Sequence, residues 1–419
     1  MESLGCKLNQ AEQEELSRQF VRAGWRSAVS PSQADVYVLN TCTVTHVADR
    51  KVRQKIRWVR RNNPKAQIIA IGCYAHQAPE RLLAAGADLV LDNNNKVNLP
   101  EMLDVENAVP SPMSAPINPI IPKGRTRSLV EIQSGCDHNC SFCIVPSTRG
   151  HSRSVPFDHV ITSVRERVNE GYKEVVLTGT EIGAYSSEGQ GILDLIKAIL
   201  GKTNVQRLRL SSLQPHELTP ELLDLWTTNR LCNHLHISLQ SGSDSVLRRM
   251  KRSYDTATFH NTVLTARKAI SDLAITTDVI IGFPGEIDAE FEESFRFCQD
   301  IEFSSIHAFP FSARPGTSAE TMRPQVKEDI KRDRIRRMLH LSECMSHRFR
   351  ERFLGQVLHV LWEKESSSGT WNGLTTNGLR VFLVDHCKNG GHSLSNRILP
   401  VRIVGTSAKG LCGHLINNI

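Results

Sequence analysis

The sequence predicts an α/β protein in three parts: a parallel α/β domain, a partial (β/α)6 barrel and a small all-β domain. Three observations predict this arrangement. Short apolar runs alternate with amphipathic stretches in two separate sections of the 419-residue chain, and a proline-rich stretch divides the two sections. After the second section, short strand-like runs alternate with turn-forming residues to the end of the sequence.

The first part covers residues 1–103. Three apolar runs have the length of buried strands, and two amphipathic stretches between them have the length of helices. We expect the strands at 35–40, 67–72 and 88–91 and the helices at 47–61 and 77–85. Because strands and helices alternate with short connections, this part is predicted to be a Rossmann-like parallel sheet. Residues 104–125 hold five of the 18 prolines and are expected to form a linker.

The second part covers residues 126–354 and contains six strand-like runs with helical stretches between them. The strands are expected at 129–133, 174–178, 207–211, 234–239, 277–281 and 305–309, and the clearest helices at 156–170, 291–301 and 326–353. Six β/α units predict a partial parallel barrel. Its chemistry is expected at the carboxyl ends of the strands.

The third part, residues 355–419, has a different residue pattern. Strand-like runs at 356–362, 379–384 and 399–404 are separated by turns rich in glycine, serine and asparagine. A segment of this length with short strands predicts a small all-β domain, with a five-stranded barrel as the best candidate.

The composition is that of a globular protein, with 40% apolar and 23% charged residues, which excludes disordered and collagen-like chains. The net charge of +7 permits a polyanionic partner without demanding one. No apolar run approaches the roughly 18 residues of a membrane span, and the first residues lack the basic and apolar regions of a signal peptide. We therefore expect a cytoplasmic protein with no membrane partner.

Eleven cysteines without an export signal favour metal or redox use of clustered cysteines over a disulfide framework. Cys136, Cys140 and Cys143 form such a cluster, with the spacing C-x3-C-x2-C directly after the first strand of the second part. Three thiolates on one loop suit three irons of a [4Fe–4S] cluster, whose fourth iron is then free to bind a substrate or cofactor. The alternative is a zinc loop or buried structural thiols, but zinc sites usually add a second pair of ligands.

This loop resembles that of the radical S-adenosylmethionine enzymes, including the aromatic Phe142 just before the last cysteine. The resemblance implies that the open iron chelates the amino and carboxylate groups of S-adenosylmethionine. One electron then cleaves the sulfonium to a 5′-deoxyadenosyl radical. The cofactor carries this chemistry, and the protein positions it.

Cys6, Cys42 and Cys73 stand apart in the sequence, but Cys42 and Cys73 each follow a predicted strand of the first part. Side chains at the carboxyl edge of a parallel sheet converge on one crevice, so the three thiols are candidates for a second cluster. On spacing alone, ordinary core cysteines are an equally good interpretation.

The whole chain resembles the methylthiotransferase family. The resemblance rests on the G-C-x-x-N, N-T-C and G-C contexts of Cys6, Cys42 and Cys73, ahead of the C-x3-C-x2-C loop and a small β domain. It continues at the strand ends in Leu177–Gly183, Arg209–Ser212, His236–Gly242 and Asp278–Glu286. In this family the final domain is the RNA-binding TRAM domain, which matches residues 355–419 in place and size.

The resemblance implies a cofactor set and a reaction. The cofactors are two [4Fe–4S] clusters, one held by Cys136, Cys140 and Cys143 and an auxiliary one held by Cys6, Cys42 and Cys73, together with S-adenosylmethionine as radical source and methyl donor. The reaction converts an adenosine C2–H to C2–S–CH3 in a tRNA anticodon stem-loop. An external electron donor, such as a flavodoxin or ferredoxin, and a sulfur source are implied as partners.

Residues at the barrel strand ends are expected to bind S-adenosylmethionine. A backbone without bulky side chains at Gly179 can pair with the methionyl ammonium, and hydroxyl or carboxylate groups can bind the ribose. The expected contact residues are Phe142, Gly179, Thr180, Glu181, Ser211, Ser212 and Gln240. Ordinary turn chemistry after a strand is the alternative interpretation of these residues.

The residues after the first cysteine, Lys7-Leu8-Asn9-Gln10, most resemble the branch that acts on N6-threonylcarbamoyladenosine next to the anticodon. The isopentenyladenosine branch usually has Gln-Met at this place, and the branch acting on a ribosomal-protein aspartate usually has Pro-Lys. Both remain alternatives, as does a non-enzymatic Fe–S protein that binds RNA or transfers electrons. Family members usually carry a complete strand before the first cysteine, but only five residues precede Cys6. Either the sequence is truncated or the first strand is shortened, and we expect a less firmly held Cys6.

Two further stretches, Arg50–Arg61 and Lys331–Arg337, are rich in cations and are either solvated helix faces or phosphate contacts. The remaining cysteines have no mutual ligand spacing and are expected to be buried or partly buried thiols: Cys232, Cys298, Cys344, Cys387 and Cys412. The 16 histidines show no metal-ligand spacing, so no histidine is expected as a ligand.

Overall fold

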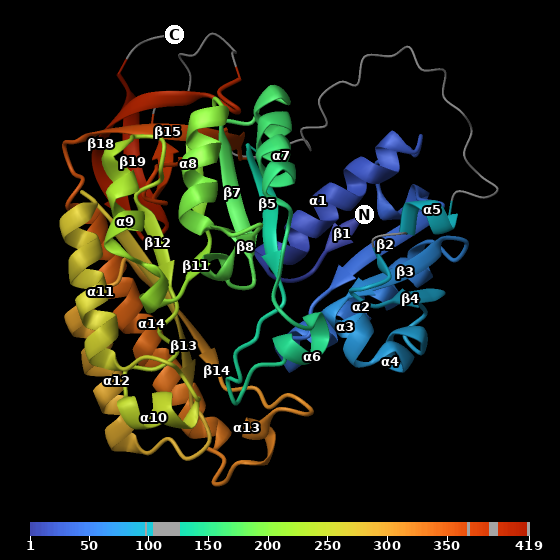
Figure 1. The fold of residues 1–419 in the computed structure, drawn as a ribbon, viewed down its shortest axis with the longest axis horizontal. Helices are drawn as coiled ribbons and strands as arrows, with labels where there is room; N and C mark the ends of the chain where they lie inside the picture. Colours follow the sequence, from blue (N-terminus) through green and yellow to red (C-terminus); the bar gives the residue numbers. More distant parts are fainter. Residues whose placement is uncertain (97–98, 104–125, 367–368, 385–392, 417–419) are drawn as a thin grey trace.

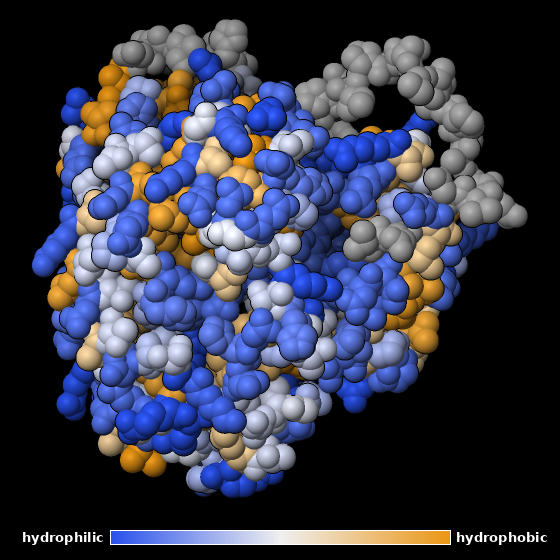
Figure 2. All heavy atoms as spheres, viewed as in Figure 1, coloured by the Kyte–Doolittle hydropathy of each residue, from blue (hydrophilic) through white to orange (hydrophobic). Residues whose placement is uncertain are grey.

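A computed structural model describes residues 1–96, 99–103, 126–366, 369–384 and 393–416 (Figure 1). The expected linker at 104–125 and Cys387 lie outside these residues. Over the described ranges, no helix has both the length and the hydrophobicity needed to cross a bilayer. The face seen in Figure 2 is largely hydrophilic, with hydrophobic residues in small separate groups.

The N-terminal unit is a parallel sheet in the order β1-β2-β3-β4. Its strands are β1 (Glu2–Ser3), β2 (Val36–Thr41), β3 (Gln67–Gly72) and β4 (Leu89–Leu91), so the three expected strands are confirmed. The first strand, β1, pairs two residues with β2. The helices are α1 (Lys7–Arg22), α2 (His46–Asn62), α3 (Cys73–Gln77), α4 (Pro79–Leu83) and α5 (Leu99–Leu103).

Two helical features of this unit differ from the prediction. The helix expected at 77–85 is two short helices, α3 and α4, because Pro79 lacks an N–H and Ala78 before it has a non-helical backbone. Helix α1 was not predicted. It buries Asn9 and Glu12 beside its apolar residues, since it packs between the N-terminal sheet and the central unit, and these polar residues obscure the amphipathic pattern.

The central unit is a partial barrel of two four-stranded sheets, β6-β5-β7-β10 and β11-β12-β13-β14. All six expected strands are confirmed. The strands are β5 (Arg127–Ser134), β6 (Arg153–Ser154), β7 (Glu174–Gly179), β10 (Arg207–Leu210), β11 (Ser212–Leu213), β12 (His234–Ile237), β13 (Ala274–Ile281) and β14 (Ser305–Pro310). All of these pair in parallel except β6, and the chain passes from one sheet to the other at Ser211.

Helices cover the outer face of the barrel, and polar residues line its inner face. Outward-facing residues such as Val175 and Leu177 pack with the helices in one large apolar cluster. Their strand neighbours, such as Glu174 and Thr178, point the opposite way, since side chains alternate along a strand. The helices are α6 (Val145–Arg149), α7 (Phe157–Asn169), α8 (Ile192–Lys202), α9 (Pro220–Leu223), α10 (Asp244–Arg249), α11 (Thr256–Ala269), α12 (Asp288–Ile301), α13 (Ser318–Thr321) and α14 (Glu328–Glu351).

The C-terminal unit is a five-stranded barrel, the predicted candidate, and it is closed in the order β15-β16-β17-β19-β18. Its strands are β15 (Val357–Glu365), β16 (Trp371–Leu374), β17 (Arg380–Leu383), β18 (Ile398–Ser407) and β19 (Gly410–Leu415). It packs directly on the central unit. The buried Arg207 of β10 donates hydrogen bonds to the carbonyl oxygens of Leu374, at 2.9 Å, and His359, at 2.7 Å.

Candidate functional site

The three cysteines of the C-x3-C-x2-C loop lie between β5 and α6 as free, half-buried thiols. Burial raises the pKa of Cys136 to about 12 and that of Cys143 to about 11, so both thiols are protonated near neutral pH and release protons when they bind metal. Arg252 donates to Cys140 Sγ at 3.1 Å, which places a cation where ligating thiolates carry negative charge. This donor set fits an iron–sulfur cluster.

Glu181, at the carboxyl end of β7, is the centre of a polar group beside this loop. Its Oε2 lies 3.6 Å from Cys136 Sγ, its Oε1 lies 2.7 Å from His138 Nε2, and its backbone N–H donates to Gln133 Oε1 at 2.9 Å. An open pocket of about 700 Å³ lies next to this group. Its lining includes the carboxyl groups of Asp137 and Glu181 and contains neither lysine nor arginine among the described residues. Such a pocket suits a cationic ligand.

Burial, and then the neighbouring Glu181 carboxylate, raises the pKa of Glu217 to about 8. An ordinary glutamate releases its proton near pH 4.5, whereas folded Glu217 keeps it up to about pH 8. The free energy of unfolding should therefore fall as the pH rises across this interval, because only the unfolded chain loses the proton.

Glu217→Gln removes this titration. We expect the melting temperature of the variant, relative to the wild type, to rise by about 3 °C or more between pH 5.5 and pH 8.5. Exposed Glu188→Gln is the matched control and should show no such trend. If the difference in melting temperature between Glu217→Gln and the wild type stays constant with pH, Glu217 does not have a raised pKa in the folded protein.

The other expected S-adenosylmethionine contacts lie on the same side of the barrel, at or just past the strand ends. Ser211 is buried, and among the described residues its hydroxyl has no hydrogen-bond partner, so it is available to a ligand. Gly179 lies against Gln133, and a Cβ there would stand 2.7 Å from the Gln133 carbonyl oxygen. Thr180 is half-buried, and Ser212 pairs with His236 in the adjoining strand.

Two of the expected contacts have structural roles of their own. The Phe142 ring packs edge-on against Phe283, which anchors the cysteine loop to the barrel. Gln240 has a left-handed backbone with a φ of 69° and ties the end of β12 to Asp278 and Ile280 of β13. Neither role conflicts with a cofactor contact.

Cys6, Cys42 and Cys73 meet at the carboxyl edge of the N-terminal sheet, as expected for side chains that follow parallel strands. Each thiol acts electrostatically on at least one of the others, and burial raises the pKa of Cys42 to about 12. Cys6 precedes α1 and is exposed, and its thiol donates to Asn9 Oδ1 at 3.0 Å. Gly72, before Cys73, is required by its left-handed φ of 97° and by Asn40, whose Oδ1 would lie 2.3 Å from an added Cβ. Three convergent free thiols fit a second cluster.

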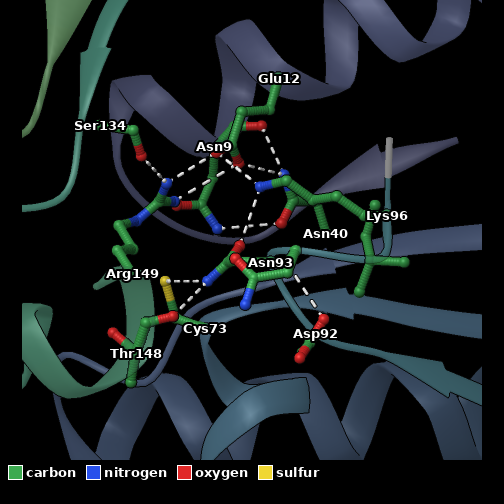
Figure 3. Close-up of polar contacts among 12 residues, drawn as sticks. Asn9, Glu12, Asn40, Cys73, Asp92, Asn93, Lys96, Ser134, Thr148 and Arg149 are labelled. Carbon is green, nitrogen blue, oxygen red and sulfur yellow. Dashed lines mark hydrogen bonds and ion pairs between the residues drawn. The ribbon is translucent and has the colours of Figure 1, made fainter. Parts of the chain in front are cut away.

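Arg149 joins the helix that follows the cysteine loop to the N-terminal unit; Figure 3 shows its contacts with Asn9 and Glu12. It is the last residue of α6, which begins two residues after Cys143, and it is buried between the N-terminal and central units. Its guanidinium donates to Glu12 Oε1 at 2.6 Å and to Asn9 Oδ1 at 3.0 Å, the atom that also accepts from Cys6.

Asn93 makes a parallel link on the other side of this network. It donates to the Thr148 carbonyl oxygen at 2.7 Å and to Cys73 Sγ at 3.7 Å. Sequence reasoning missed Asn9 and Asn40, although both belong to the quoted cysteine contexts. Asn40 donates to Glu12 Oε2 at 3.0 Å and to the Asn9 carbonyl oxygen at 2.9 Å.

We expect Arg149→Met to lower the free energy of unfolding by about 3 kcal/mol, because a buried ion pair loses one partner. Lys96, 2.6 Å from Glu12, keeps the loss at the lower end of the usual range. Urea unfolding of the N-terminal and central units gives the midpoint and the free energy of unfolding. Exposed Arg165→Met, which loses a single long hydrogen bond, should change this free energy by less than about 0.5 kcal/mol. Equal midpoints for the two variants would contradict a docking role for Arg149.

The N-terminal unit also contacts the far edge of the barrel, after β14. Arg314 is buried and donates to Asp49 Oδ2 at 2.8 Å and to Thr43 Oγ1 at 2.7 Å. Since Arg149 holds the edge near β5 and Arg314 the edge near β14, the N-terminal unit bridges the open side of the partial barrel (Figure 1).

One further expectation requires correction. Cys344 lies exposed on α14 rather than buried or partly buried, whereas Cys232 and Cys298 are buried and Cys412 half-buried. Histidines do take part in compact polar groups that sequence spacing did not reveal, because the members come from different strands and loops. These groups are His138, Glu181 and His216, and His236, Asp278 and His307.

Comparison with known proteins agrees with this geometry. A model of the Radical SAM superfamily matches residues 130–298, and one of the Uncharacterized protein family UPF0004 matches residues 1–92. A threonylcarbamoyladenosine tRNA methylthiotransferase from Bacillus subtilis is 34% identical, covering 96% of this chain and 92% of its own length. The chain belongs to the methylthiotransferase family of radical S-adenosylmethionine enzymes.

Two other members of this methylthiotransferase family are also similar to this chain over most of its length. An enzyme of the same name from Thermotoga maritima is 36% identical over 89% of this chain and 88% of its own length. A tRNA-2-methylthio-N(6)-dimethylallyladenosine synthase from Thermodesulfovibrio yellowstonii is 30% identical over 100% of this chain and 98% of its own.

The fold is also shared with a solved structure of the radical S-adenosylmethionine methyltransferase TsrM from Kitasatospora setae, with cobalamin and a [4Fe–4S] cluster bound. The TM-score is 0.51 at 14% identity, covering 75% of this chain and 69% of that chain. At this identity, the match supports the fold of the methylthiotransferase and nothing finer.

Proposed function

We propose that this enzyme converts N6-threonylcarbamoyladenosine next to the anticodon of tRNA to its 2-methylthio derivative. The observation that carries the proposal is the junction of the two cysteine groups. α6 begins two residues after Cys143, and its last residue, Arg149, reaches the hydrogen-bond partner of Cys6. The residues that would hold the radical-generating cluster are therefore linked, through one buried arginine, to those that would hold the auxiliary cluster.

In this proposal the clusters and S-adenosylmethionine, when bound, supply the radical, the sulfur and the methyl group. Cys136, Cys140 and Cys143 would hold the radical-generating cluster, and Cys6, Cys42 and Cys73 the auxiliary cluster. Glu181, with Glu217 behind it, would orient the ammonium end of S-adenosylmethionine. Arg149 and Arg314 would keep the N-terminal unit seated on the barrel, which keeps the two groups at a constant separation.

We propose that the three units divide this work. Residues 1–103 would hold the auxiliary cluster, residues 126–354 the radical chemistry, and residues 355–419 would act as a TRAM domain toward tRNA, with 104–125 as a linker. A tRNA substrate places the enzyme in the cytoplasm. An external electron donor and a sulfur source complete the reaction, since the radical step consumes an electron and the product gains a sulfur atom.

Helix α2 is the better of the two basic stretches for phosphate contact. Val52, Ile56 and Val59 form its buried face, and among the described residues four of its exposed cations have neither a hydrogen bond nor an ion pair: Arg50, Lys51, Arg57 and Arg61. In α14, by contrast, most cations of Lys331–Arg337 are paired with acidic residues. The cations of α2 are therefore available to a polyanion.

A double variant Arg57→Gln, Arg61→Gln should bind tRNA more weakly. The slope of log Kd against log salt should fall by about 1 to 2, because up to two phosphate contacts are lost. The matched control on α14, Arg332→Gln with Arg336→Gln, should leave both quantities near those of the wild type. Fluorescence anisotropy at several salt concentrations measures both. Equal effects of the two pairs would remove α2 as a specific anchor.

The function itself is tested with anaerobically reconstituted enzyme, S-adenosylmethionine, a reductant and a sulfide source. Three tRNA substrates are compared: one with threonylcarbamoyladenosine, one with isopentenyladenosine and one with unmodified adenosine next to the anticodon. Mass spectrometry of the digested nucleosides should detect a 2-methylthio product from the first tRNA alone. Product from the isopentenyl tRNA instead would assign the enzyme to the other tRNA branch.

A further inference from the structure

Three side chains of metal-ligating types meet on the inner face of the second barrel sheet: His236, Asp278 and His307. They come from the adjacent strands β12, β13 and β14, and Asp278 stands directly opposite His307 in the parallel register. Their strand neighbours Val279 and Ile306 pack in the apolar cluster under the outer helices. Because side chains alternate along a strand, the three polar residues face the barrel interior. Paired strands hold such a group more precisely than loops do.

The carboxylate of Asp278 lies between the two imidazoles. Its Oδ2 is 3.4 Å from His236 Nε2 and its Oδ1 is 3.2 Å from His307 Nδ1, and the two rings stack with their centroids 5.8 Å apart. Two atoms that ligate one tetrahedral zinc ion at about 2.0–2.1 Å lie about 3.3 Å from each other. Both measured distances therefore equal one edge of a zinc coordination sphere.

Direct charge-assisted hydrogen bonds account less well for these distances, because such bonds bring nitrogen and oxygen to about 2.7–2.9 Å. Two other histidine–carboxylate pairs of the chain do reach 2.7 Å: His138 with Glu181, and His151 with Asp137. The wider spacing around Asp278 leaves room for an ion that all three groups share.

The second nitrogen of the His236 ring has a partner of its own. Nδ1 lies 3.0 Å from Thr276 Oγ1, and the same hydroxyl lies 3.0 Å from His234 Nε2. A metal-bound histidine usually gives its other ring nitrogen to such a partner, which fixes the tautomer and the ring orientation. When Nδ1–H of His236 donates to Thr276, Nε2 presents a lone pair to Asp278. Since a lone pair and a carboxylate oxygen repel each other, a cation between them stabilises the arrangement.

The site is open on one side. The exposed fraction rises from 9% for the His236 side chain to 31% for Asp278 and 55% for His307, so an ion can enter from solvent. Burial opposes ionisation of Asp278, but hydrogen bonds from the two histidines lower its pKa, and it is a carboxylate near neutral pH. Three protein ligands with an open fourth position are typical of zinc sites that also bind water.

We infer that His236, Asp278 and His307 form a third metal site, which binds one divalent zinc-type ion through two imidazoles and a carboxylate. Nitrogen and oxygen donors without sulfur suit such an ion, whereas the two cysteine groups suit iron–sulfur clusters. The site goes beyond the proposed function, because its three residues hold neither cluster. Its open fourth position would take water or another oxygen ligand.

The test uses the reconstituted enzyme, in which the clusters occupy the six ligand cysteines, and zinc sulfate as the probe. After free zinc is removed by gel filtration, elemental analysis should find one zinc ion per chain and an unchanged iron content. X-ray absorption at the zinc edge should show a nitrogen and oxygen shell at about 2.0–2.1 Å and no sulfur shell at about 2.3 Å. A sulfur shell would place the zinc on cysteines and overturn the inference.

Variants identify the ligands. His307→Gln changes the most exposed of the three side chains, so we expect it to fold, and circular dichroism checks this. In a competition titration with a zinc-binding dye, His307→Gln and Asp278→Asn should each weaken binding by more than about 100-fold. Thr276→Val, which removes only the outer-shell partner, should weaken binding by about 10- to 100-fold. Exposed His260→Gln is the matched control and should keep the wild-type affinity.

The inference is wrong if the wild type retains no zinc, or if His307→Gln binds zinc as tightly as the wild type. The three residues would then be a hydrogen-bonded group only. The proposed function is tested separately through the methylthio product, so its failure and the failure of the metal site are distinguishable.

Discussion

Replacing Cys136, Cys140 or Cys143 by alanine should abolish formation of 5′-deoxyadenosine from S-adenosylmethionine. With one of three ligands gone, the loop retains two thiols, and a [4Fe–4S] cluster that already lacks a fourth protein ligand cannot be held by two. The half-buried positions of these thiols indicate that their replacement leaves the barrel core intact. We therefore expect a folded protein with no detectable cleavage.

The measurement is anaerobic reconstitution followed by chromatography of the nucleoside product under dithionite. Exposed Cys344→Ala is the matched control, since it removes a thiol outside both cysteine groups and should cleave at the wild-type rate. Wild-type cleavage in any one of the three loop variants would refute the assignment of that cysteine.

Cys42→Ala or Cys73→Ala should separate the two halves of the reaction. Each variant should lose about half its iron, about four of eight atoms if both clusters are [4Fe–4S], and should still cleave S-adenosylmethionine. Neither should form a methylthio product. The physical reason is that these thiols belong to a different unit from the C-x3-C-x2-C loop, with its own apolar core.

Iron analysis, 5′-deoxyadenosine and methylthio product are measured on the same preparations. A variant that keeps all its iron, or that still forms product, would show that its cysteine is not an auxiliary ligand. Cys6 is exposed and is preceded by only a two-residue strand, so we expect it to be held less firmly than Cys42 and Cys73. In the wild type, the auxiliary cluster should then lose iron to a chelator faster than the barrel cluster does.

The C-terminal barrel cannot be tested by simple removal, because its carbonyl groups satisfy a buried arginine of the central unit. Deleting residues 355–419 would leave the Arg207 guanidinium without the Leu374 and His359 oxygens and would uncover Phe353. A loss of tRNA binding in such a deletion could therefore arise from unfolding. Surface charge variants of the intact chain avoid this ambiguity.

Much of the architecture could be predicted from local pattern. Buried strands such as β3 and β13 are continuous apolar runs, and a period of two or of 3.6 residues depends only on neighbouring positions. The C-x3-C-x2-C spacing is local in the same sense, since one loop carries all three thiols. The hydrophobic pattern did not predict a helix where the segment is buried on two sides. α1 buries Asn9 and Glu12 as well as Leu16, so its polarity does not follow one face.

By itself, the sequence determined the succession of three units, the six strands of the central unit, the all-β class of the C-terminal unit and the six candidate ligand cysteines. Only the tertiary structure decided which distant groups meet: Arg149 with Glu12, Arg252 with Cys140, and Arg314 with Asp49. The physical reason is how far apart in the sequence the contacting residues are. Strand and helix patterns arise from contacts a few residues apart, whereas these pairs are separated by more than 100 residues and form only when the chain has folded.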